Sequence, residues 1–183
     1  MLHRDMLKSE IEKIIEGKGG FVQIDYLTAY LKEDITMEMK KFAYSKLIVA
    51  YERMRMYADV AKVYHNLSVF SIAYSEKMKC HIREADYYIK AGDFENADLA
   101  MKKGMHHANS MEKEDIYFAV KNLYLRQAEV YEKEMKRNQA TKIYEKLLEM
   151  NLTGSESGLF KKKLIGLYEK LGKFHDAKRI VLE

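Results

Sequence analysis

The chain has 183 residues, a formal net charge of +4, no proline, no tryptophan and nine glycines. At an average usage of about 5% proline, roughly nine would be expected, and their absence excludes proline turns and favours uninterrupted helix. With 48% hydrophobic and 33% charged residues the chain is long enough to bury a core, and its charge excess is too small to identify a partner.

Apolar residues recur every three or four positions along the chain without sustained alternation, and this period predicts an all-α fold. Residues 1–33 are expected to form an N-terminal helix pair. Three later helix starts carry capping signals, namely Asp93 after Gly92, Asn109 with Glu112, and Thr153 with Glu156. Helices of this length joined by short turns pack as antiparallel neighbours.

An internal repeat emerges when the chain is aligned on four tyrosines, Tyr51, Tyr88, Tyr131 and Tyr168. Three positions earlier the segments carry Ile48, Ala85, Ala128 and Ile165, and nine positions later Val60, Ala97, Ala140 and Ala177. Two segments also have a glycine four residues after the tyrosine, Gly92 and Gly172. Small residues let two helices approach closely, so the pattern predicts helix hairpins.

The pattern resembles the tetratricopeptide repeat, best between Ala85 and Ala97. The resemblance implies a right-handed α-solenoid of stacked antiparallel helix hairpins. About four repeats would cover residues 34–183 as one continuous domain: 36–74, 75–110, 111–151 and 153–183.

The sequence also departs from that family. The tyrosines are 37, 43 and 37 residues apart rather than about 34, and the proline that commonly closes each repeat is missing. The third segment has Met135 and Arg137 where the family prefers a glycine and an aromatic residue. Pentatricopeptide RNA readers share the architecture, but their proline-containing turn is absent here too, which argues against base-by-base RNA reading.

Nothing in the sequence predicts a membrane location. The N-terminal residues are charged from His3 to Lys13, which excludes the apolar core of a signal peptide. No apolar stretch approaches the ~18 residues that span a bilayer. Cys80 is the single cysteine and cannot form an intramolecular disulfide. We therefore expect a cytoplasmic protein without a membrane partner.

The sequence offers no support for catalysis. It has no HExxH, no GxSxG, no glycine-rich phosphate loop and no spaced cysteines. Cys80 and His81 are adjacent but point about 100° apart on a helix, so we expect a semi-buried cysteine beside a surface histidine. His106 and His107 are expected near a helix C-terminus, where imidazole complements the dipole. We predict no enzyme, no cofactor and no metal.

Two sets of aligned basic residues, here called the basic columns, are not explained by helix packing. Five residues before each tyrosine, and again two residues after it, every segment has a lysine or arginine: Lys46, Arg83, Arg126 and Lys163 in the first column, and Arg53, Lys90, Lys133 and Lys170 in the second. By composition, one column of four would be all basic about once in a thousand. The resemblance implies that this face of each first helix lines a concave groove. A solvated face, partly neutralised by Glu52, Glu132 and Glu169, would look similar.

The first functional hypothesis is a non-catalytic scaffold that binds an acidic or carboxylate-bearing protein segment in a basic groove. The alternative is binding of nucleic-acid phosphates by the same residues, which we consider less favoured. The carboxylate clamp of some tetratricopeptide domains is not carried over, because Ser45 and Val49 stand at its lysine and asparagine positions. The last repeat ends without a capping helix, so we expect it to pair with another copy, with a partner, or with further sequence.

Overall fold

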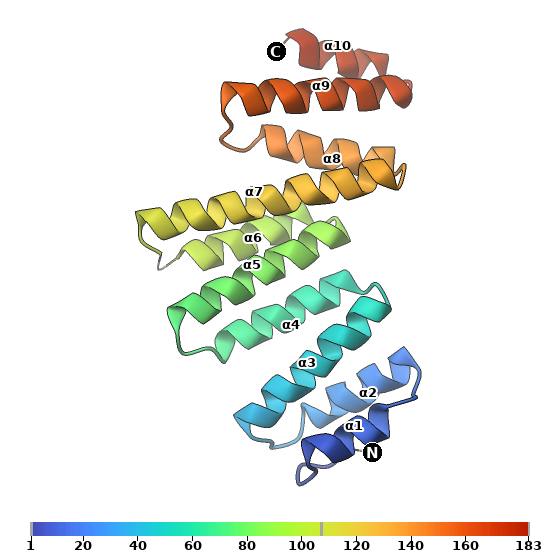
Figure 1. The fold of residues 1–183 in the computed structure, drawn as a ribbon, viewed down its shortest axis with the longest axis vertical. Helices are drawn as coiled ribbons and strands as arrows, with labels where there is room; N and C mark the ends of the chain where they lie inside the picture. The colour runs from blue at the N-terminus through green and yellow to red at the C-terminus, as the bar shows by residue number, and fades with distance from the viewer. Residues whose placement is uncertain (1, 107, 183) are drawn as a thin grey trace. The chain divides into compact units, whose positions relative to one another are not determined.

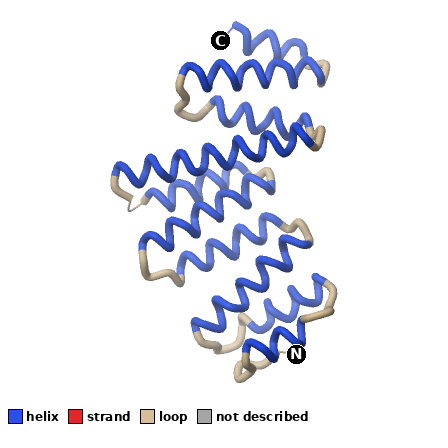
Figure 2. The backbone as a smooth tube through the Cα atoms, in the orientation of Figure 1, coloured by secondary structure: helices blue, strands red, loops and turns tan. Residues whose placement is uncertain are grey.

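The computed structural model describes residues 2–106 and 108–182. Within these residues the secondary structure consists of ten α-helices and no strand (Figure 2), so the predicted all-α class is confirmed. The chain forms two compact units, residues 1–112 and residues 113–183, each described by itself below. None of the described helices combines the length and the apolar character needed to cross a bilayer.

The first unit contains six helices and the first turn of a seventh (Figure 1). They are α1 (Lys8–Ile15), α2 (Gly20–Tyr30), α3 (Met37–Arg53), α4 (Tyr57–Val69), α5 (Tyr74–Ala91) and α6 (Phe94–Met105). Each helix packs against the next one along the chain, most extensively α4 against α5 and α5 against α6. Its largest fully buried side chains include Ile11, Leu27, Tyr30 and Ile89.

The second unit contains most of α7 (Ser110–Lys133), followed by α8 (Arg137–Leu148), α9 (Gly154–Lys170) and α10 (Phe174–Leu182). Helix α9 packs against both α8 and α10. The core is built from buried apolar residues three or four apart on these helices: Ile116, Val120 and Tyr124 on α7, Ile143 and Leu147 on α8, and Leu164 and Leu167 on α9. This is the stripe that a period of 3.6 residues predicts.

The small residues of the repeat pattern lie where close packing requires them. Val60 on α4, Ala97 on α6 and Ala140 on α8 are fully buried, and Ala177 on α10 is 5% exposed. A larger side chain at these positions would overpack the contact between helices.

Four helices end in the same backbone turn, and each turn begins at one of the aligned tyrosines. The carbonyl of the tyrosine accepts a hydrogen bond from the N–H five residues later, at 2.8–2.9 Å, from Met56, Asp93, Lys136 and Lys173. A second bond links the residue after the tyrosine with the N–H three positions further, at 2.9–3.1 Å. This pair of bonds is the Schellman motif, which requires one residue in the left-handed region.

The left-handed residue stands four positions after each tyrosine. Gly92 and Gly172 adopt φ of 78° and 73° there, and Arg55 and Met135 adopt 56° and 57°. The sequence pattern had a glycine at only two of these places. The backbone is therefore the same in all four turns although two of them carry a residue that disfavours it.

The predicted helix starts are confirmed. The Asp93 side chain accepts a hydrogen bond from the Asn96 N–H at 3.2 Å. Asn109 and Glu112 bond each other's backbone N–H reciprocally at 2.9 Å. Thr153 and Glu156 form the capping box that their spacing predicts. Each cap satisfies backbone donors that the first turn of a helix leaves unpaired.

The unusual spacing of 43 residues has a local origin. Helix α7 has 24 residues, whereas α5 and α9, which carry the neighbouring repeat tyrosines, have 18 and 17. The extra length therefore lies in a helix and not in a turn.

Candidate functional site

The basic columns lie on four helices, α3, α5, α7 and α9. In the first unit Lys46 and Arg53 are on α3, and Arg83 and Lys90 on α5; in the second, Arg126 and Lys133 are on α7, and Lys163 and Lys170 on α9. Six of the eight side chains are exposed, and Lys46 and Lys90 are half-buried. Two residues seven apart lie two turns, about 10.5 Å, along one helix face.

Half of these cations are paired with acidic side chains. Lys90 lies 3.0 Å and Arg83 3.9 Å from Asp86, on their own helix. Lys46 pairs with Glu12 of α1, and Lys163 with Glu132 of α7 at 3.0 Å. In contrast, Arg53, Arg126, Lys133 and Lys170 form no ion pair with another described residue. These four side chains carry the charge of the columns that no ion pair within the described residues neutralises.

Two of the glutamates that could neutralise the columns are held by tyrosine hydroxyl groups. Tyr87 of α5 donates to Glu52 of α3, and Tyr144 of α8 donates to Glu132. Burial opposes ionisation of Glu132, but the hydrogen bonds from Tyr144 and Lys163 and the charges of Lys163 and Lys170 outweigh it and lower its pKa. Burial and the glutamate acceptor together raise the pKa of Tyr144 above its ordinary value.

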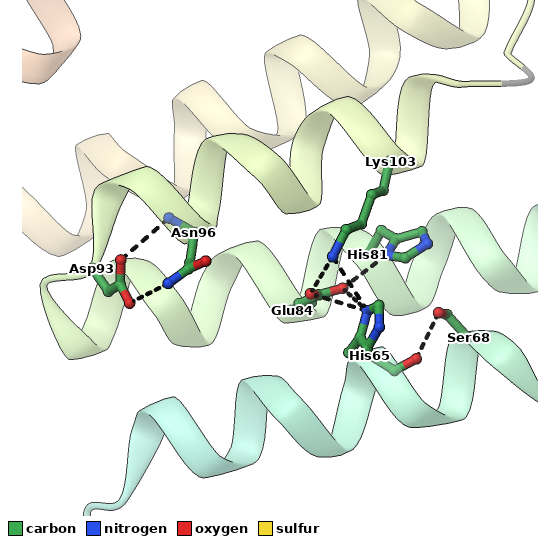
Figure 3. Close-up of polar contacts among 7 residues, drawn as sticks. All are labelled: His65, Ser68, His81, Glu84, Asp93, Asn96 and Lys103. Carbon is green, nitrogen blue, oxygen red and sulfur yellow. Dashed lines mark hydrogen bonds and ion pairs between the residues drawn. The ribbon is translucent and has the colours of Figure 1, made fainter.

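A second polar site surrounds a buried carboxylate between α4, α5 and α6 (Figure 3). Glu84 of α5 is 2% exposed. Its carboxylate lies 2.8 Å from His81 Nδ1, one turn earlier on the same helix, and 3.3 Å from His65 Nδ1 of α4. The ammonium of Lys103 on α6 lies 3.6 Å from it. Burial raises the pKa of Glu84, but these three groups outweigh it and the net direction is downward.

The residues around Glu84 are fixed by the helices that carry them. Ser68 donates a hydrogen bond at 2.7 Å to the carbonyl of His65, and Asp93 caps the start of the helix that carries Lys103 (Figure 3). The cluster lies beside a cavity of about 530 Å³ in the first unit. The cavity wall includes Tyr74, Leu99, Lys102 and His106 together with His65 and His81.

The structure corrects one prediction about this region. His81 was expected at the surface, but its side chain is only 12% exposed because Glu84 draws it toward the helix interface. Cys80 is half-buried as predicted, and burial is the main reason that the pKa of its thiol is raised, which makes it a poor nucleophile. His106 follows the last residue of α6, as expected, whereas His107 lies outside the described residues.

Sequence reasoning missed the cluster because it weighed only histidines adjacent in sequence. The spacing of His81 and Glu84, three residues apart on a helix, was a readable signal. His65 could not be added to it, since it lies on another helix and meets Glu84 only through tertiary packing.

Comparisons with protein-family models, with curated proteins and with solved structures give no match for this chain.

Proposed function

We propose that the protein is a non-catalytic, cytoplasmic interaction scaffold, a tetratricopeptide-like α-solenoid that binds an acidic or carboxylate-bearing segment of a partner protein. The observation that carries the proposal is the recurrence of two basic positions on α3, α5, α7 and α9, at a fixed distance from a turn with the same hydrogen bonds each time. Solenoids present such repeated positions on one extended surface.

The chemistry of the columns suits carboxylates. Arginine and lysine donate charge-assisted hydrogen bonds, and the arginine guanidinium can bind a carboxylate with two of them. Arg126 and Lys133 are exposed and make no ion pair with another described residue, so a partner need not break an existing bond to reach them. In this proposal the paired members, such as Lys163, position neighbouring acids instead of binding the partner directly.

The test is a charge reversal within one unit. The double variant R126E/K133E is compared with K142E/K178E, which changes the same charge in the same unit at exposed lysines on the second helices α8 and α10. Binding of a labelled oligoglutamate peptide is measured by fluorescence anisotropy. We expect R126E/K133E to weaken binding by about tenfold or more, corresponding to about 1.4 kcal/mol, and the control to weaken it clearly less.

Equal losses in the two variants would refute a column-specific site and leave only general attraction to a cationic protein. A single-stranded oligothymidylate of the same charge is measured in parallel. If it binds more tightly than the peptide, and its log affinity falls linearly with log salt, phosphate binding replaces the carboxylate proposal.

A further inference from the structure

The cluster around Glu84 brings together three side chains of the types that bind metal ions. One nitrogen from each of His65 and His81 and one oxygen of Glu84 all lie within 4.8 Å of one another. They come from two packed helices, α4 and α5, and Glu84 is almost completely buried. Among the described residues, no other group of three histidine, cysteine or acidic side chains brings its ligand atoms this close together.

The separations fit a tetrahedral ion with short bonds. With metal–ligand bonds of 2.0–2.1 Å, two ligands at the tetrahedral angle stand about 3.3 Å apart. Oε2 of Glu84 lies 3.4 Å from His65 Nδ1 and 2.8 Å from His81 Nδ1, so the first separation already fits and the second has to open by about half an ångström. The two imidazole nitrogens lie within 4.8 Å of each other, a separation that rotation of the two side chains can adjust.

The positive charge of Lys103 lies next to the groups that would bind such an ion. Its ammonium lies 3.5 Å from the His65 nitrogen and 3.6 Å from Glu84, so it contacts two of the three ligand groups. A buried carboxylate needs a cation nearby, and the lysine supplies one. Its side chain is 47% exposed and flexible, so the ammonium can move into solvent when another cation arrives.

The ligand set also leaves an open side. His65 and His81 line the 530 Å³ cavity, so a fourth ligand can approach from there. Lys77, Lys102 and Lys103 line the same cavity, which favours an anionic fourth ligand such as a carboxylate. Two imidazoles with one carboxylate suit Zn²⁺ rather than Mg²⁺ or Ca²⁺, which prefer oxygen ligands throughout.

We propose that His65, His81 and Glu84 form a binding site for a zinc-class divalent ion, and that the Lys103 ammonium neutralises the Glu84 carboxylate when the ion is absent. The site is independent of the scaffold function proposed above. It requires no reaction and makes no residue catalytic.

The experiment is a titration of the full-length protein with Zn²⁺ alone, followed by isothermal calorimetry. The variants are H65A, E84Q and K103M. The matched control is K102M, because Lys102 lines the same cavity but forms no ion pair with Glu84, whereas Lys103 does. We expect one ion per chain, an affinity loss of about 100-fold or more in H65A and E84Q, and tighter binding in K103M. K102M is expected to bind like the wild type.

Several outcomes would overturn the proposal. One is the absence of saturable binding in both the wild type and K103M, and another is equal binding in H65A and the wild type, which would place the ion elsewhere. Mg²⁺ binding as tight as Zn²⁺ binding would also contradict the ligand set. Should E84Q fail to fold, H65A decides alone, because His65 is 40% exposed. Co²⁺ gives a second readout through the visible absorption of a tetrahedral site.

Discussion

Replacing Met135 by glycine should stabilise the protein. Met135 holds φ of 57° in the turn between α7 and α8, and its side chain is 65% exposed, so little packing is lost. The left-handed region costs an ordinary residue about 1–2 kcal/mol. Glycine removes that cost but loses about 0.5–1 kcal/mol more entropy on folding. The difference is a net gain of about 0.5–1 kcal/mol, read as a higher midpoint of urea unfolding at unchanged slope.

Two control variants separate the backbone effect from other causes. M135A removes the side chain but keeps the unfavourable φ, so it should lie close to the wild type. G158A places alanine inside α9, where an added Cβ meets nothing within 4 Å, and should gain about 1 kcal/mol because glycine is a poor helix former. A loss of stability in M135G, or an equal gain in M135A, would refute the argument from the left-handed turn.

The capping glutamate of α9 gives a prediction for acid. Hydrogen bonds from Lys121 and the Thr153 backbone lower the pKa of Glu156 to about 2, so its contribution to stability is complete above about pH 4.3 and is lost as the pH falls toward 2. E156Q should flatten that acid-induced loss in circular dichroism melts at pH 2–6, and a wild-type slope in the variant would contradict it. L164A should destabilise by about 2–5 kcal/mol in urea, since Leu164 is fully buried; a change below about 1 kcal/mol would mean that the site collapses around the smaller side chain. Val181 and Leu182 on α10 are 67% and 87% exposed, so we expect self-association by light scattering that the double variant V181D/L182D removes; a monomeric wild type would exclude it.

The fold class and several helix starts could be predicted from the sequence because they depend on local chemistry. A period of 3.6 residues and a capping side chain act within a few residues, as Asp93 and Thr153 illustrate. The turns at Arg55 and Met135 could not be predicted in the same way. Their left-handed backbone is unfavourable for the residue itself and is imposed by the helix ends on either side.

The two candidate sites differ in the same respect, because one depends on local spacing and the other on contacts between helices. The basic columns follow from spacing alone, so the sequence already placed them on one face of each first helix. The pairs of Arg83 and Lys90 with Asp86 follow from spacing on one helix, whereas the pair of Lys163 with Glu132, 31 residues apart, depends on a contact between helices. The site around Glu84 needs His65, which is 19 residues away on another helix. No pattern of single-helix spacing brings that residue to the cluster.

The four Schellman turns also indicate where the chain can be cut and extended. Their bonds end on backbone carbonyls, so the tyrosine rings take no part in closing them, but the count of five residues from carbonyl to N–H is fixed. Length differences lie in the helix that ends at the turn, as the 24 residues of α7 against the 18 of α5 illustrate. A reporter domain or an epitope tag should therefore be inserted in the loop between α8 and α9, ahead of the Thr153 cap, and never between a repeat tyrosine and the start of the next helix.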